Sequence, residues 1–201
     1  ALNADNPQGN VQENSNLIDQ YLFQDKSLDK LSKSFFEPND QIGMNANAPK
    51  HVEEFTQKLA EHAEAASSVS GIPAKFMLGQ AALESGWGKK EIKAMDGSPS
   101  HNVFGIKATG QWKGKTVDTL TTEYSNGVAY QKVEKFRAYD NYADAFKDYA
   151  KLLTENPRYQ NVIQHSNDPS RFALELQKAG YATDPQYAQK INNIIKHSLS
   201  I

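Results

Sequence analysis

The chain has 201 residues, a formal net charge of −2 and no cysteine. This length accommodates one ordinary domain and an appendage. The near-neutral charge gives no indication of nucleic-acid binding, and the absence of cysteine excludes disulfides, thiolate metal sites and a thiol nucleophile. No apolar run is long enough to span a bilayer and no signal peptide is recognisable, so we expect no membrane insertion. The first residue is Ala1 rather than methionine, which indicates a chain processed or cut from a longer protein.

Residues 1–48 differ in composition from the rest of the chain. The stretch 1–16 is rich in Asn and Gln and has few apolar residues, a composition typical of disorder. Scattered apolar positions within 17–36 permit a short amphipathic helix before the chain returns to loop composition. We therefore predict a largely disordered linker over residues 1–48 and a folded domain over residues 49–201.

From Lys50 onward most of the chain has a helical pattern. Val52, Phe55, Leu59 and Ala63 recur at steps of three and four, as on the buried face of an amphipathic helix. Further helices are predicted from the same periodicity and from Pro, Gly, Asn and Asp at helix ends, with Asp184 capping the last. The approximate ranges are 50–70, 73–84, 89–95, 141–156, 169–179 (with Phe172, Leu174 and Leu176 as buried candidates) and from 185 onward.

The segment 116–139 changes to the pattern of a β-hairpin. It begins with a run rich in β-branched residues, and Asn126-Gly127 is a strong signal for a two-residue turn. Alternation along the first strand puts Thr119, Thr121 and Glu123 on one face. Glu123 therefore ends a polar, hydroxyl-lined face that suits a sugar-binding groove.

The stretch Gln80-Ala-Ala-Leu-Glu-Ser-Gly-Trp-Gly88 contains the first candidate for chemistry. Glu84 lies near the end of a predicted helix among apolar and aromatic neighbours, and no Lys or Arg lies between Lys75 and Lys89. Such surroundings disfavour the charged form of a carboxyl and raise its pKa, as a general acid near neutral pH requires. The alternative is a glutamate that faces solvent at a helix end, because helices commonly end in glycine.

Four motifs occur in order along the chain. They are Ala82-Leu-Glu-Ser-Gly-Trp-Gly88, Asn102-Val-Phe-Gly-Ile-Lys107, Thr122-Glu-Tyr124 and Gly180-Tyr-Ala-Thr-Asp-Pro185. Together they make the chain similar, over about residues 50–201, to the peptidoglycan hydrolases of glycoside hydrolase family 73, the endo-β-N-acetylglucosaminidases. The resemblance implies a mainly α (α+β), lysozyme-like fold with two lobes, one of them a small β-hairpin lobe, and a groove between them.

The resemblance also implies catalytic roles for three side chains. Glu84 would protonate the leaving oxygen, and Glu123 would be the second carboxylate, activating water. Tyr181 would lie close to the acid and orient the acetamido group or the water. The structural alternatives are a solvated strand glutamate for Glu123 and a core tyrosine for Tyr181. Inverting, retaining and substrate-assisted mechanisms all stay open, because the sequence does not give the separation of the carboxyls.

Further residues are expected to contact the sugar. Phe104 offers an apolar face, Asn102 can hydrogen-bond hydroxyl or acetamido groups, and Gly105 allows close backbone approach. The alternative for the aromatic residues is core packing. The full set of predicted substrate-binding residues is Asn102, Phe104, Trp87 and Tyr187.

Other chemistries find no support in the sequence. The five histidines show no metal-ligand spacing, and there is no G-x-S-x-G elbow of a serine hydrolase. We therefore expect neither a metal nor a cofactor.

The functional interpretation is a glycosidase that cleaves the β-1,4 bond between N-acetylglucosamine and N-acetylmuramic acid, opening the wall locally for flagellar rod assembly. Its partners would be peptidoglycan glycan strands and, through an N-terminal domain outside this chain, flagellar rod proteins. Its location would be the periplasm, reached by flagellar export or, alternatively, by means of a signal removed before Ala1. Two alternatives stay open: a muramidase or lytic transglycosylase, which also uses one helix-end glutamate, and a catalytically silent peptidoglycan-binding rod scaffold.

Overall fold

The computed structural model describes residues 48–125, 128–182 and 184–199, with only the backbone described for 122–125. The predicted linker, apart from Ala48, and the predicted Asn126-Gly127 turn lie outside these residues. Within the described ranges, no helix has both the length and the apolar character that a membrane crossing requires.

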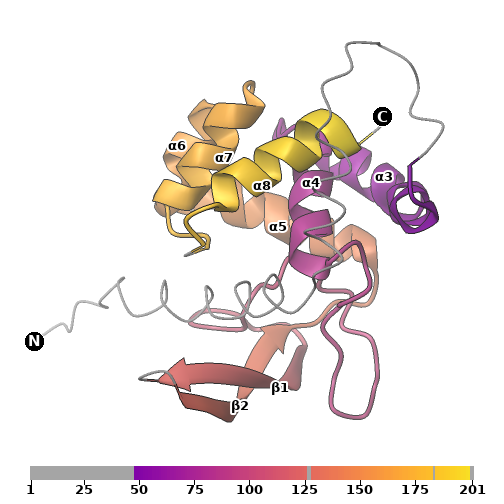
Figure 1. The fold of residues 1–201 in the computed structure, drawn as a ribbon, viewed down its shortest axis with the longest axis vertical. Helices are drawn as coiled ribbons and strands as arrows, with labels where there is room; N and C mark the ends of the chain where they lie inside the picture. The colour runs from indigo at the N-terminus through magenta and orange to yellow at the C-terminus, as the bar shows by residue number, and fades with distance from the viewer. Residues whose placement is uncertain (1–47, 126–127, 183, 200–201) are drawn as a thin grey trace, which may run out of the picture.

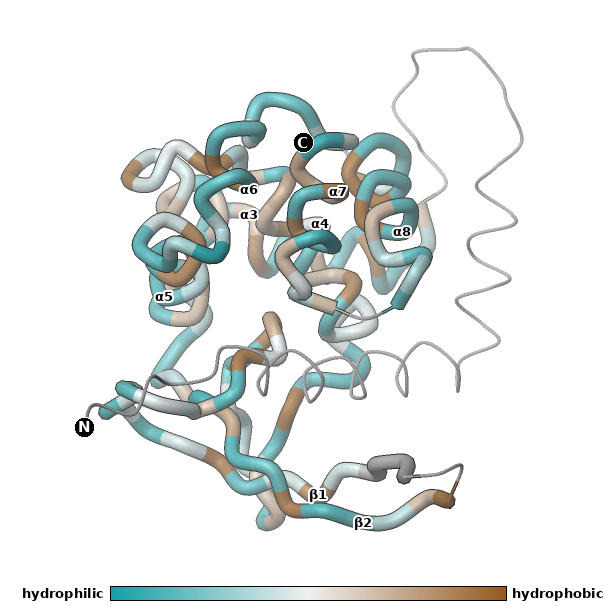
Figure 2. Tube along the Cα trace, turned by 90° about the vertical axis from the view of Figure 1, so that its left-hand side faces the viewer, coloured by the Kyte–Doolittle hydropathy of each residue, from teal (hydrophilic) through white to brown (hydrophobic). Residues whose placement is uncertain are grey.

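The described chain is mainly helical, with a single two-stranded antiparallel sheet among its described elements. Figure 1 shows the helices gathered together and the hairpin projecting away from them. Figure 2, turned by 90°, shows the same division into a helical part and a hairpin part. This is the predicted two-lobed, lysozyme-like arrangement. The elements are α3 (Lys50–Ser70), α4 (Ala74–Ser85), β1 (Thr116–Ser125), β2 (Val128–Arg137), α5 (Tyr142–Glu155), the 3-10 helix η1 (Pro157–Tyr159), α6 (Gln160–Gln164), α7 (Pro169–Lys178), α8 (Tyr187–Asn193) and the π-helical η2 (Ile194–Ser198).

Helix α4 forms the centre of the helical part. Nine of its 12 residues are buried, as expected for a helix that is apolar on all sides and surrounded by other elements. Gly79 lets η2 approach closely, since a Cβ atom at this position would lie only 2.7 Å from Cγ1 of Ile195. Packing on several sides fixes the C-terminal end of α4, where Glu84 is located.

The ends of several helices follow the predicted signals. Gly71 takes the left-handed conformation (φ 77°) after α3. Asn141 caps α5 by accepting the backbone N–H of Asp144 at 2.9 Å, and the carboxylate of Asp168 accepts two N–H groups at the start of α7.

Three predictions about the helices are wrong. Residues 89–95 form turns and a β-bridge between Lys93 and Pro99 instead of a helix. Leu174 is 43% exposed, because it lies on the outer face of α7. The last helix begins at Tyr187 rather than at 185, although Asp184 does accept the N–H of Gln186 just before it.

The hairpin directs its polar face toward the rest of the domain. Thr121 is buried and donates its hydroxyl to the carbonyl of Lys132, while Glu134, also buried, forms an ion pair with the buried Lys107 at 3.6 Å. The cross-strand pair Leu120 and Val133 lies on the opposite face and is about half exposed. Polar contacts, rather than apolar burial, therefore hold most of the hairpin.

The hydrophobic clusters show the same division. The main core runs through the helices and includes Val103, Phe104 and Ile106 from the loop before the hairpin. The hairpin adds Phe136 to a small second cluster with Ile92, against which Val117 packs.

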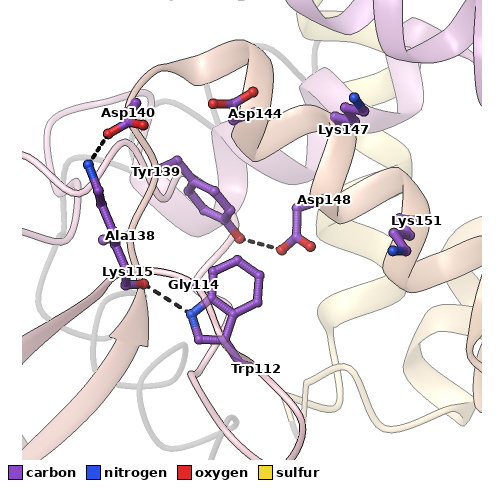
Figure 3. Close-up of a pocket in the computed structure, with 10 residues that line it drawn as sticks. All are labelled: Trp112, Gly114, Lys115, Ala138, Tyr139, Asp140, Asp144, Lys147, Asp148 and Lys151. Atoms are coloured by element: carbon purple, nitrogen blue, oxygen red, sulfur yellow. Dashed lines mark hydrogen bonds and ion pairs between the residues drawn. The ribbon is translucent and has the colours of Figure 1, made fainter.

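Arg137, at the base of the hairpin, joins it to helix α5. Its backbone N–H donates to Ile106, its Nε to the carbonyl of Lys107, and its Nη1 to Oδ2 of Asp148 on α5 at 2.9 Å. The hydroxyl of Tyr139 donates to the same carboxylate oxygen at 2.6 Å, as Figure 3 shows. We call the three side chains Arg137, Tyr139 and Asp148 the lobe clamp.

Replacing Asp148 with asparagine tests the lobe clamp. The free energy of unfolding, measured by urea denaturation, should fall by about 1.5–3 kcal/mol, the range for hydrogen bonds to charged groups. Asp144→Asn is the matched control because Asp144 is exposed one turn earlier on α5, and its cost should stay below about 1 kcal/mol. Equal losses in the two variants would contradict the clamp.

Candidate active site

A turn of three left-handed residues ends α4 directly after Glu84-Ser85. Gly86, Trp87 and Gly88 have φ values of 55°, 57° and 79°, and the N–H of Trp87 closes the helix end by donating to Ala82 at 2.8 Å. A bulky residue in this region costs about 1–3 kcal/mol. Edge-to-face packing of the Trp87 ring on Phe55, at 5.5 Å between centroids, offsets part of this conformational cost. Trp87 is 9% exposed and therefore supports the turn more than it offers a sugar-binding face.

Glu84 is half-buried as a residue, and the surrounding protein desolvates its carboxyl. Tyr187 donates its hydroxyl to Oε1 at 3.0 Å. Oε2 lies beside Gly105, where an added Cβ atom would be 3.6 Å away. Burial raises the pKa of Glu84 to about 8, and the hydrogen bond from Tyr187 acts in the opposite direction. At neutral pH the side chain is therefore mostly protonated.

Asn102 organises the loop that brings Gly105 to the acid. Its Oδ1 accepts the N–H groups of Phe104 and Ile106, and its Nδ2 donates to the carbonyls of Ile106 and Arg137, both at 2.9 Å. With 1% exposure, Asn102 has these internal partners instead of the predicted sugar. Its position gives it a structural role.

Phe104 is buried in the same way. Its ring stacks on Tyr149 with centroids 4.0 Å apart and planes 7° apart, and meets Phe146 edge-to-face. The side chain is 1% exposed. The predicted contact between Phe104 and a sugar ring does not fit this burial, because the ring already packs against the core.

Two tyrosines from the fourth motif region lie next to the acid. Tyr181 donates its hydroxyl to the carbonyl of Phe104 at 2.9 Å, which steadies the loop that leads to Gly105. Tyr187 is fully buried and bonds directly to Glu84, so the predicted groove contact of Tyr187 is replaced by a contact with the acid. Burial raises the pKa of both phenols well above 10, which keeps them protonated.

Sequence reasoning missed two further polar residues near the acid. Gln80 and Tyr149 are both fully buried and are hydrogen-bonded to each other. Gln80 also donates to Tyr187. The available signal was a glutamine inside an otherwise apolar helix, since buried polar groups require partners.

The structure places Glu123 only through its backbone. In β1 it pairs with Tyr130 of β2, and the strand register puts it on the same face of the hairpin as Thr121. Its side chain lies outside the described residues, so its distance from Glu84 stays a prediction.

A hollow of about 390 Å³ lies elsewhere, between the base of the hairpin and α5 (Figure 3). Trp112, Tyr139 and Asp148 line it together with Lys115, Lys147 and other residues, but Glu84 does not. The guanidinium of Arg137 covers the Trp112 ring at 4.6 Å. This hollow therefore belongs to the lobe clamp rather than to the acid. Among the described residues, no group of His, Asp and Glu side chains is arranged to hold a metal ion.

The chain was compared with known protein families and sequences. Residues 60–199 match the family model Glucosaminidase, described as mannosyl-glycoprotein endo-beta-N-acetylglucosaminidase. Peptidoglycan hydrolase FlgJ of Escherichia coli K12 is 48% identical over 147 residues, which cover 73% of this chain and 47% of the relative. FlgJ of Salmonella typhimurium is 42% identical over 174 residues, covering 87% and 54%. The chain thus spans about half the length of these curated relatives.

Solved structures agree with the sequence matches. The glycoside hydrolase domain of Salmonella typhimurium FlgJ, truncated at its C-terminus, superposes with a TM-score of 0.61 at 47% identity, covering 72% of this chain and 95% of that one. A mutant of a peptidoglycan hydrolase from Sphingomonas sp. A1 gives a TM-score of 0.64 at 47% identity, covering 72% and 92%. On the family match, which takes in most of the folded domain, the chain belongs to the glucosaminidase family.

Proposed function

We propose that this chain is an endo-β-N-acetylglucosaminidase that cleaves the β-1,4 bond between N-acetylglucosamine and N-acetylmuramic acid in peptidoglycan. Family membership supports the reaction class, and relatives named peptidoglycan hydrolase support the substrate. One observation carries the proposal most directly. The carboxyl of Glu84, with a pKa of about 8, stands beside a glycine that leaves room for a substrate.

In the proposed reaction Glu84 donates its proton to the glycosidic oxygen as the bond from that oxygen to the anomeric carbon breaks. A water molecule then supplies the new oxygen on that carbon and releases a proton. Negative charge develops on Glu84 during the first step, and the hydroxyl of Tyr187 is already directed at Oε1 to stabilise it. The same hydrogen bond opposes the effect of burial on the pKa of Glu84.

We assign Glu123 as the second carboxylate, which accepts the proton of the attacking water. The hydroxyl of Tyr181 donates a hydrogen bond to the carbonyl of Phe104. Its oxygen is therefore still able to accept a hydrogen bond from the acetamido N–H or from water. Asn102 and Phe104 act indirectly, by holding the loop that carries Gly105. Trp87 supports the turn behind the acid.

The biological setting extends the proposal further. A substrate in the wall implies action in the periplasm or the wall, and relatives named FlgJ make local opening of the wall during flagellar rod assembly the favoured setting. Rod proteins as partners and flagellar export belong to this proposal. We further propose that residues 49–201 carry the whole catalytic site and that residues 1–48 act as a linker.

Analysis of the cleaved linkage tests the proposed activity. Purified peptidoglycan is digested, the products are reduced with borohydride, and the new reducing sugar is identified. We expect reduced N-acetylglucosamine. Reduced N-acetylmuramic acid would indicate a muramidase, an anhydro-muramyl end would indicate a lytic transglycosylase, and no cleavage would indicate a binding scaffold.

The Glu84→Gln variant tests which residue is the acid. We expect its turnover to fall by about 10²–10⁴-fold, the usual contribution of a general acid. The variant should remain folded and be at least as stable as the native protein at pH 7. The amide keeps a partner in Tyr187, and it avoids the cost of protonating on folding a carboxyl that is ionised in the unfolded chain at pH 7. Native turnover in a folded variant would remove Glu84 from its role.

The pH dependence of kcat/KM tests the protonation state of the acid. Glu84 must be protonated to act, so activity should fall as the pH rises through about 8. The measurement uses soluble glycan fragments, because the titration of intact peptidoglycan would add its own pH dependence. A profile that stays flat across this pH range would contradict the assignment.

The Glu123→Gln variant separates catalysis from binding. We expect kcat to fall on the order of 10²-fold while KM for glycan fragments changes little, because a water-activating group acts only in the reaction. Asp118→Asn, an exchange on the same strand, is the control. Weaker binding with native kcat would make Glu123 a sugar-binding residue.

A further inference from the structure

A chain of three hydrogen bonds runs from the core to the acid. The hydroxyl of Tyr149 donates to Oε1 of Gln80, Nε2 of Gln80 donates to the hydroxyl oxygen of Tyr187 at 3.0 Å, and Tyr187 donates to Oε1 of Glu84 at 3.0 Å. The first three side chains have no exposed surface. They come from α5, α4 and α8, so the chain links three helices to one carboxyl oxygen.

The donor-to-acceptor direction of this hydrogen-bond chain follows from the number of protons that each group carries. A phenol has one proton to donate, and an ionised carboxylate can only accept. When Glu84 is charged, the hydroxyl of Tyr187 must donate its hydrogen bond to the carboxylate. The other hydrogen bond of Tyr187, which its oxygen accepts, must then come from a donor. The amide nitrogen of Gln80 is that donor, which turns the amide oxygen of Gln80 toward Tyr149.

Turning the Gln80 amide by 180° would reverse the chain. The amide oxygen would then face Tyr187 and accept its proton, and Oε1 of Glu84 would lose its donor. The hydroxyl of Tyr149 opposes this reversal. It donates a hydrogen bond to the amide oxygen in the observed orientation, and it would lose that acceptor if the amide turned. The orientation of one buried amide therefore decides whether Tyr187 serves the acid.

We propose that Gln80 is a positioning residue for the general acid, anchored by Tyr149. It holds the Tyr187 hydroxyl on Oε1, so that the transferable proton of Glu84 sits on Oε2, the oxygen beside Gly105. It acts through Tyr187 and does not touch the substrate. This inference rests on the proposed role of Glu84 as the acid.

Among the described residues, the titratable side chains that interact with Glu84 are all phenols. The phenols that interact electrostatically with Glu84 are Tyr149, Tyr159, Tyr181 and Tyr187, from α5, η1, the loop before α8 and α8 itself. Burial raises the pKa of each phenol, so all four stay neutral while Glu84 loses its proton. A change in the alkaline limb of the activity profile therefore reports on the hydrogen bond to Glu84.

The test compares Tyr149→Phe and Gln80→Met with the native protein. Tyr149→Phe removes one hydroxyl that is three hydrogen bonds away from Glu84 and lets the Gln80 amide turn. The pKa of Glu84 should rise because burial is then less opposed, moving the alkaline limb upward by about 1 pH unit. kcat should fall about 10-fold, the equivalent loss of transition-state stabilisation, and KM should stay near its native value because neither residue reaches the substrate.

Tyr159→Phe is the matched control. Tyr159 is also a buried tyrosine that interacts with Glu84, but it lies outside the chain of hydrogen bonds. Its variant should leave the alkaline limb unchanged. An equal movement of the alkaline limb in this variant would overturn the proposal, because the shift would then not depend on the hydrogen bonds that connect Tyr149 to Glu84.

The remaining outcomes also decide the question. Activity that falls in both variants without movement of the limb would assign Gln80 and Tyr149 a purely structural role and overturn the proposal. An unchanged profile in Tyr149→Phe would overturn it as well, and this variant, which keeps the ring, decides the case if Gln80→Met does not fold. Failure of the proposed function is recognised separately, by native turnover in Glu84→Gln.

Discussion

The carboxyl of Glu84 is subject to two opposing effects. Burial favours its neutral form and raises its pKa to about 8, whereas the hydroxyl of Tyr187 favours its charged form. A fully solvated carboxyl would already be ionised at neutral pH and would have no proton to give. A buried carboxyl without a donor would hold its proton too firmly. The observed combination keeps the acid protonated before the reaction and stabilises it after the proton has left.

Much of the fold serves to maintain this balance. Helix α4 is buried on nearly all sides and ends in a left-handed turn, which fixes the backbone on which the acid stands. The loop that Asn102 holds by hydrogen bonds brings Gly105 next to Oε2 of the carboxyl. The hairpin that carries Glu123 is attached differently, by ion pairs and the lobe clamp more than by apolar packing. The acid is thus set in the rigid core, whereas its proposed partner is on an element held by polar contacts, which yield more readily to local opening.

The sequence predicted those features that depend on neighbours along the chain. The apolar surroundings of Glu84 indicated its raised pKa, and strand alternation and the turn signal indicated the hairpin. The roles of Phe104 and Tyr187 depend on tertiary packing, since an aromatic residue in a loop or helix can face either a ligand or the core. Periodicity does not decide between them. Gln80 was similarly hidden, because its partners lie 69 and 107 positions away. The short helix predicted after α4 was wrong because the left-handed turn and the Lys93 bridge give that segment another path.

If the folded protein holds Glu84 protonated at neutral pH, this carboxyl must titrate well above the usual range. An NMR titration of the protein labelled with ¹³C at the glutamate side-chain carboxyl tests this, with the Glu84 signal assigned by its absence in Glu84→Gln. We expect a single glutamate carboxyl that titrates far above the others, with a midpoint near the pKa of about 8. A Glu84 signal that titrates near the ordinary value of 4.5 would contradict it.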